Sequence, residues 1–180
     1  MLSLDISNEY FDEEKQEFVS ESFSVELEHS LVSLSKWEYE HEKPFLGKEE
    51  KTDKEVLSYV RAMLVSPSEK ELPDLWWLRL SQDNLDTINE HIDAKKSATW
   101  FNNLTEDKPS NETITSELIY YWMIAHQVPP QYETWHLSRL FTLIRISGIK
   151  NTPPEKRKKM SASDRRRLNE ERLKKYNTKG

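Results

Sequence analysis

Cysteine is absent from this chain of 180 residues, and glycine occurs only 3 times. The lack of cysteine excludes disulfides, thiolate metal ligands and cysteine nucleophiles. Three glycines are too few for a glycine-rich phosphate-binding loop. No apolar run approaches the roughly 20 residues of a membrane-spanning helix, and the acidic N-terminus does not resemble a signal peptide. We therefore expect a soluble intracellular protein without contact to a membrane.

Hydrophobic residues are also scarce, although aromatic residues are not. The hydrophobic share is 36% and the charged share is 32%, yet the chain holds 6 Trp, 7 Tyr and 6 Phe. A disordered chain is poor in aromatic residues. This composition indicates a folded core with polar extensions.

Charge is divided unevenly along the chain. Residues 1–150 contain 15 Lys and Arg against 28 Asp and Glu, a net charge of −13. Residues 151–180 contain 11 against 4, a net charge of +7. Such an asymmetry indicates that the tail meets an acidic surface, which is its own body, a partner protein or nucleic acid.

Apolar and polar residues alternate at the N-terminus, from Leu2 to Ile6 and again from Phe23 to Leu27. This period of two predicts half-buried strands, and the acidic stretch between them closes a hairpin. The alternative is a short helix that includes Phe11 and Phe18.

Helical patterns follow, with their own start and stop signals. One begins at Leu31 and ends before Pro44. Thr52 and Glu55 have the spacing of a capping box, and Ser81 is a good N-cap for the segment 82–94. Residues 75–80, LWWLRL, are either a buried strand or a helical turn, because so short a run does not show its period.

The longest aromatic and aliphatic block runs from Ile114 to Lys150. Two helical patterns lie on either side of its Val-Pro-Pro sequence at 128–130. Thr113 or Thr115 caps the first pattern, and Gly148 is placed to end the second. The block predicts a helix hairpin, residues 115–149, that carries much of the core.

We therefore expect a mainly α fold, with a small helical domain built on a C-terminal helix-hairpin core. A short N-terminal β-hairpin and a basic C-terminal extension complete it. The expected divisions are an acidic segment at 1–28, the helical domain at 29–150 and a flexible or helical basic tail at 151–180. Within the tail, residues 161–176 form a short basic helix that is marginal alone.

Catalytic and metal-binding patterns are weak. His126, His136, Glu117 and Glu133 are the candidate metal ligands, but only Glu133 and His136 have a helical ligand spacing. Acidic residues occur in runs on solvated faces, and no nucleophile elbow or nucleotide-binding motif is present. We therefore expect no enzyme, no cofactor and no metal.

A helix–turn–helix reading of the 114–150 block is also unfavourable. Its second helix offers few basic residues, and an acidic body repels phosphate. The basic tail remains a candidate for non-specific contact with nucleic acid, for pairing with an acidic protein surface, or for a solvated arm.

Tryptophan-rich segments are the remaining candidates for a binding surface, since Trp anchors many interfaces. They are equally compatible with a buried core. The predicted partner-binding residues are the four tryptophans and three tail arginines Trp37, Trp76, Trp77, Trp122, Arg165, Arg166 and Arg167.

Four segments resemble a group of small tailed-bacteriophage proteins: residues 27–46, the SATWF segment 97–101, the block 114–151 and the ending 168–180. Together they cover about two thirds of the chain, and they include no catalytic motif. The group belongs to virion morphogenesis, and some of its members are similar to tail assembly chaperones.

The resemblance implies a protein that binds the tape-measure protein or another tail or neck component in the host cytoplasm during assembly. Self-association through the tail is a further expectation. One alternative is a structural virion protein of the neck, tail or baseplate. The other is a nucleic-acid-binding regulator that acts through the basic tail.

Overall fold

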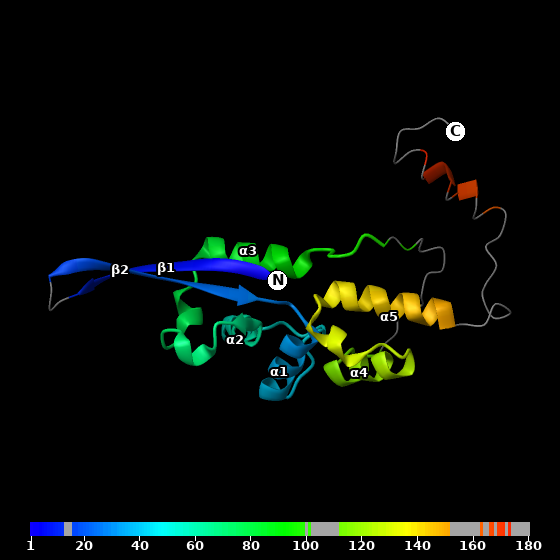
Figure 1. Ribbon diagram of the computed structural model, residues 1–180, viewed down its shortest axis with the longest axis horizontal. Helices are drawn as coiled ribbons and strands as arrows, with labels where there is room; N and C mark the ends of the chain where they lie inside the picture. Colours follow the sequence, from blue (N-terminus) through cyan, green and yellow to red (C-terminus); the bar gives the residue numbers. More distant parts are fainter. Residues whose placement is uncertain are drawn as a thin grey trace.

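A computed structural model describes residues 1–12, 16–99, 101 and 112–151, together with 163, 166, 167, 169–171 and 173 of the tail. Figure 1 shows an elongated arrangement in which a long β-hairpin projects from a body of helices. The predicted tail helix, 161–176, lies largely outside the described residues, and those of its residues that are described are helical.

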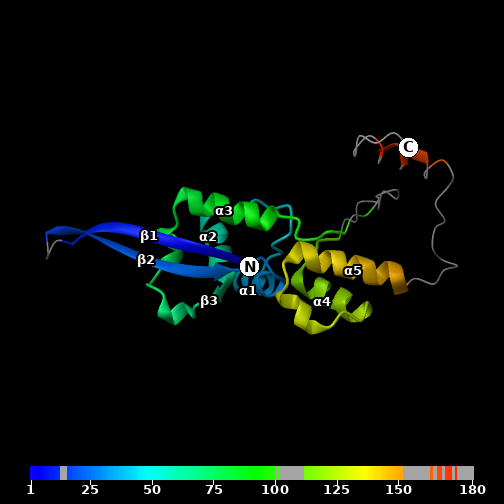
Figure 2. The same ribbon diagram turned by 45° about the horizontal axis from the view of Figure 1, so that its top comes forward.

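The N-terminal hairpin is confirmed. Strands β1 (Leu2–Asp12) and β2 (Glu17–Leu27) pair antiparallel, with Leu4 opposite Val25. These two side chains and the neighbouring Ile6 and Leu27 are buried. The alternation therefore directs one face of the hairpin into the core near its open end, while the other end extends beyond the body (Figure 2).

A third strand, β3 (Leu64–Ser66), pairs antiparallel with β2 and completes a sheet of order β1-β2-β3. The prediction of a mainly α fold is therefore wrong, because the chain has a mixed α/β architecture. Three residues are too few to show alternation, and the Ser-Pro-Ser sequence at 66–68 indicates only the end of a helix.

Helices α1 (Leu31–His41), α2 (Asp53–Ala62) and α3 (Gln82–Asp93) begin where local signals place them. In the predicted capping box, the Glu55 carboxylate accepts the Thr52 N–H at 2.8 Å. The Ser81 hydroxyl caps α3 as predicted, at 3.2 Å from the Asn84 nitrogen. Two short 3₁₀ turns, η1 (Glu69–Glu71) and η2 (Trp76–Arg79), lie between α2 and α3, so the LWWLRL segment is helical.

The predicted helix-hairpin core is wrong. Helix α4 (Ser116–Ala125) is joined to α5 (Leu137–Asn151) through a 3₁₀ turn, η3 (Pro130–Thr134). The Asn151 side chain donates to the carbonyl oxygen of His126, at 3.4 Å, so the far end of α5 meets the far end of α4. The connection must therefore return along α4, and the two helices run in the same direction (Figure 1). Gly148 lies inside α5 and does not end it.

Buried side chains form two hydrophobic clusters, and α1 contributes to both. The sheet cluster lies between the sheet, α2, η2 and α3, and contains Leu4, Ile6, Val25, Leu27, Trp37, Tyr59, Val60, Met63, Leu72, Trp76 and Ile88. The helix cluster lies between α1, α4 and α5, and contains Leu31, Leu34, Ile119, Met123, Val128, Leu137, Leu140 and Ile144.

The sheet cluster combines residues on both sides of position 28. The hairpin face formed by Leu4 and Ile6 packs in the same cluster as Trp37 of α1. The predicted division of the chain at 28/29 and 150/151 stays a prediction.

Two fully buried tryptophans differ in their hydrogen bonding. The Trp37 Nε1–H donates to the Glu55 carbonyl at 2.9 Å, whereas Trp76 Nε1 has no partner among the described residues. We expect Trp37→Phe to lower the free energy of unfolding by about 1 kcal/mol more than Trp76→Phe, because only the first change removes a hydrogen bond. Denaturant unfolding of the two variants measures this difference. Equal losses, or a larger loss for Trp76→Phe, would contradict it.

Candidate functional site

Strand β2 leaves the sheet at residues Glu28, His29 and Ser30, where it meets elements from three other parts of the chain. The Glu28 N–H donates to the Met63 carbonyl at 2.9 Å, and the His29 carbonyl accepts the Leu137 N–H at 2.7 Å. The Ser33 hydroxyl donates to the Glu28 carbonyl at 2.6 Å. We call residues 28–30, with their partners His91 and His136, the polar junction.

The ionisable side chains of the polar junction are buried. Glu28, His29, His91 and His136 expose only 8%, 6%, 5% and 4% of their surface. The Glu28 Oε1 lies 3.0 Å from His91 Nε2, and its Oε2 lies 2.5 Å from the Met1 ammonium. Three of the 5 histidines of the chain therefore lie in one buried cluster.

His136 and His29 are held by separate partners. His136 Nε2 lies 2.8 Å from the His91 carbonyl oxygen, and its Nδ1 lies 2.9 Å from the Ser138 hydroxyl. A carbonyl only accepts, so Nε2 carries the proton. His29 Nδ1 lies 2.6 Å from the Tyr59 hydroxyl, and its ring meets His136 edge to face at 5.3 Å.

These surroundings set the charge state of the cluster. Burial, helped by the nearby His136 and His91, lowers the pKa of His29 to about 4. Burial also lowers the pKa of His91, although the Glu28 carboxylate opposes this shift. Burial raises the pKa of Glu28, but hydrogen bonds from the Met1 ammonium and His91 outweigh it and hold this pKa below its usual value. A carboxylate therefore lies beside two imidazoles, His29 and His91, whose pKa values are lowered.

Such a set of side chains is able to hold a metal ion. Among the described residues, Glu28, His91 and His136 each offer a ligand atom, and these atoms lie within 4.8 Å of one another. Neutral imidazoles and a carboxylate are ordinary ligands of zinc. Of the candidates from the sequence, only His136 belongs to this group. Glu133 instead accepts a hydrogen bond from the Tyr120 hydroxyl at 2.9 Å.

Sequence reasoning missed Glu28 and His91 because neither has a second ligand at helical spacing. The group assembles from the end of β2, from α3 and from the residue before α5. An isolated beta bridge between Ser30 and His136 helps to bring these segments together. No local pattern could have indicated it.

A cleft of about 710 Å³ opens beside the polar junction. Its lining includes Glu28 and His136 from the junction, an apolar part formed by α1, β3 and Met63, and four cationic groups: the Met1 ammonium, Lys36, Lys96 and Arg139. The Arg139 guanidinium lies 3.7 Å from the centroid of the Trp135 ring. This cleft is therefore cationic within an otherwise acidic body.

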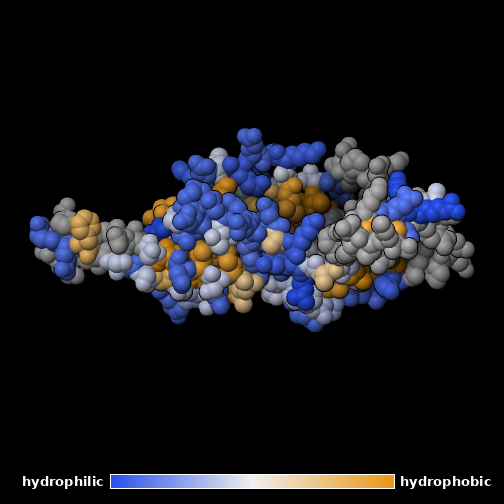
Figure 3. Space-filling view, turned by 90° about the horizontal axis from the view of Figure 1, so that it is seen from above, coloured by the Kyte–Doolittle hydropathy of each residue, from blue (hydrophilic) through white to orange (hydrophobic). Residues whose placement is uncertain are grey.

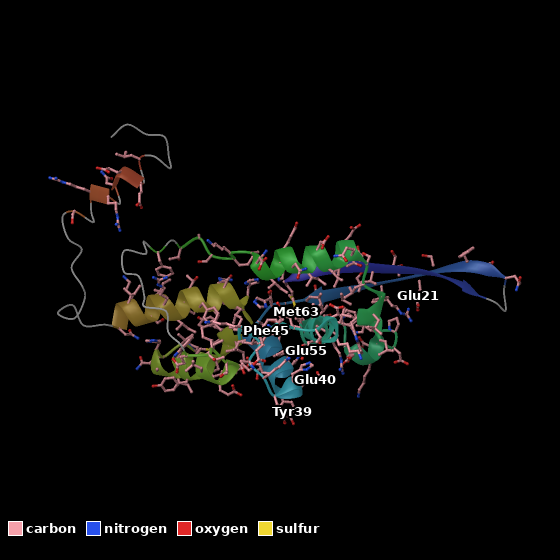
Figure 4. All side chains as sticks on the ribbon, turned by 180° about the vertical axis from the view of Figure 1, so that it is seen from behind. Glu21, Tyr39, Glu40, Phe45, Glu55 and Met63 are labelled. Carbon is pink, nitrogen blue, oxygen red and sulfur yellow. The ribbon has the colours of Figure 1, made fainter. Side chains whose placement is uncertain are left out.

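Figure 4 places Met63 inside the body and Tyr39 at the outer end of α1.

The predicted partner-binding tryptophans fall into two pairs. Trp37 and Trp76 are fully buried in the sheet cluster. Trp77 and Trp122 are half-buried. The Arg61 guanidinium lies over the Trp77 ring at 4.9 Å, and Trp122 packs near Phe141.

The tail arginines are only partly described. Arg166 and Arg167 are exposed, and Arg165 lies outside the described residues. A role in partner binding stays a prediction for the tryptophans and the arginines alike.

Exposed apolar side chains gather on α4. Tyr121 is 63% exposed and Ile124 is 76% exposed, and Ala125 beside them is also exposed. Ile119 and Met123 on the opposite side are buried in the helix cluster. We call Tyr121, Ile124 and Ala125, with the half-buried Leu118 and Trp122, the α4 face.

Hydrophobic surface also occurs elsewhere on the molecule. Leu75 and Leu78 beside Trp77 are each more than half exposed. Figure 3 shows hydrophobic areas between hydrophilic ones on the side of the body that it displays. Among the residues described, none of the helices combines the length and the apolar character needed to cross a bilayer.

No protein-family model matches this chain, and no curated protein and no solved structure is significantly similar to it.

Ser138 ties α5 to the segment after α3. Its hydroxyl oxygen lies 2.9 Å from His136 Nδ1, 3.2 Å from the Ala94 carbonyl oxygen and 3.3 Å from the backbone nitrogen of Lys96. We expect Ser138→Ala to lower the free energy of unfolding by about 1–2 kcal/mol relative to Ser147→Ala.

The control makes the same substitution in the same helix, so the change of residue type is matched. Thermal and denaturant unfolding measure the difference. Equal stabilities of the two variants would show that the Ser138 contacts contribute nothing.

Proposed function

We propose that this protein is a non-enzymatic assembly factor of a tailed bacteriophage that acts as a tail assembly chaperone for the tape-measure protein. The resemblance of residues 27–46, 97–101, 114–151 and 168–180 to phage morphogenesis proteins supports this lineage. The single observation that carries the binding role is the exposed α4 face.

Helix α4 is apolar nearly all round, which is unusual for a helix with one side in water. Its sequence, SELIYYWMIA, has one charged residue, Glu117, and its inner side already packs in the helix cluster. A surface helix normally presents polar residues outward, so an apolar outer side indicates a surface that a partner covers. The chain has a mean hydropathy of −0.84, which makes this concentration more notable.

The chemistry of the face suits a helical partner. Tyr121 and Ile124 are three positions apart, and Ala125 follows, so all three lie on one side of α4. A helix with an apolar stripe is able to lie across this side and bury aromatic and aliphatic carbon. Tape-measure chains are long and helical with apolar stripes, which a chaperone must cover before the tail is built.

The charges of the body and the tail fit the same role. A net charge of −13 over residues 1–150 keeps a complex with an apolar partner in solution. The basic tail, including Arg165, Arg166 and Arg167, is available for a second contact with an acidic tail component or another copy. In this proposal the protein acts in the host cytoplasm.

The test is a comparison of two surface variants. We expect Tyr121→Ser combined with Ile124→Ser to weaken binding of the tape-measure protein at least about tenfold, because each buried apolar side chain contributes about 1.5–3 kcal/mol. The control is Tyr39→Ser, which removes an 89% exposed tyrosine from α1. Copurification from cells that express both proteins, followed by titration, measures the effect.

Two results would contradict the proposal. One is equal binding by the double variant and the control. The other is mass spectrometry of purified virions that finds the protein at a fixed copy number, which indicates a structural component of the particle. A chaperone is absent from finished virions.

A further inference from the structure

We infer that Glu28, His91 and His136 form a binding site for one zinc ion. This inference is independent of the proposed chaperone role. It rests on the position of three ligand side chains, on the donor atoms that they offer and on the cleft beside them.

The three residues come from separate parts of the chain. Glu28 follows β2, His91 lies in the last turn of α3, and His136 precedes α5. Their ligand atoms nevertheless lie within 4.8 Å of one another, and all three residues are buried. Zinc bonds to nitrogen and oxygen are about 2.0–2.2 Å long, so ligand atoms around a tetrahedral ion are about 3.3 Å apart. The ligand atoms therefore need to move closer together by at most about 1.5 Å to form the site.

The donor set selects the kind of ion. Two imidazoles and one carboxylate favour zinc or a similar transition metal, whereas magnesium and calcium prefer oxygen ligands. Metal ions bind to an imidazole nitrogen that carries no proton. The ion takes the place of the proton that His91 Nε2 shares with Glu28 Oε1, and that proton moves to Nδ1 of the same ring. At His136 the ion takes Nε2 in place of the hydrogen bond to the His91 carbonyl, and the Nε2 proton moves to Nδ1, where the Ser138 hydroxyl oxygen accepts it.

The fourth position of the ion faces solvent. Glu28 and His136 both line the cleft, so a water molecule is able to complete a tetrahedron from that side. The Met1 ammonium and the other cationic groups of the cleft repel a positive ion, which lowers the affinity of the site for zinc. Because the ammonium lies on Glu28 Oε2, Oε1 is the oxygen left for the ion.

An ion at this position joins the two hydrophobic clusters. His91 belongs to the helix that covers the sheet, and Ile88, one turn before it, lies in the sheet cluster. His136 precedes Leu137 of the helix cluster. A metal bound only by the folded chain therefore stabilises the packing of the two parts against each other.

The experiment uses the full chain, purified without a histidine tag and freed of metal by dialysis against a chelator. Zinc and cobalt(II) are titrated at pH 7.5, with the visible absorption of cobalt reporting tetrahedral coordination. We expect one equivalent to bind and to raise Tm. We expect His91→Gln and His136→Gln to weaken binding at least about tenfold, and His126→Gln, a histidine outside the group, to bind like the unmodified chain.

The inference is overturned if the unmodified chain binds neither ion in a saturable way. It is also overturned if His91→Gln and His136→Gln bind as tightly as His126→Gln. Circular dichroism shows whether each variant folds. Where one does not, the cobalt spectrum of the unmodified chain decides, because octahedral coordination or no coordination contradicts the site.

Discussion

The whole fold depends on the polar junction, where β2 turns into α1. Within three residues, 28–30, the backbone bonds to Met63, which joins α2 to β3, and to Leu137 of α5, and the Glu28 side chain reaches His91 of α3. Because these groups are buried, each one costs stability unless it has a partner. The hydrogen bonds between these groups fix how the sheet cluster and the helix cluster are oriented relative to each other. The same bonds place the cleft and the exposed side of α4.

The sequence predicted those features that depend on residues close together in the chain. The starts of α2, α3 and α4 follow from side chains that cap them, and the alternation from Leu2 to Ile6 gives one face of the sheet. The predictions that are wrong concern features that depend on contacts between residues far apart in the sequence. The path of residues 126–136 is set by bonds from His136 and Leu137 to His91 and His29, so the helix hairpin predicted around the Val-Pro-Pro sequence does not form. The three-residue β3 exists because β2 offers it an edge.

The candidate sites also have some features that the sequence shows and others that depend on the packing of the folded chain. The aromatic richness of α4 is visible in the sequence, but which side chains are exposed depends on how α4 packs. Trp37 and Trp76, two of the predicted contact residues, are instead fully buried, because an indole is as suitable for a core as for an interface. The group of Glu28, His91 and His136 has no signal in the sequence. The cleft beside this group is lined by Glu28, His136 and four cationic groups, and the exposed α4 face does not account for it.

The central physical claim is that the polar junction makes the two hydrophobic clusters one cooperative unit. Native-state hydrogen exchange at increasing denaturant tests it directly through the amides of Glu28 and Leu137, which bond across the junction. If the account is right, both amides and those buried in α5 exchange only by global unfolding, with one common free energy. An α5 that opens at a lower free energy than the sheet would contradict it.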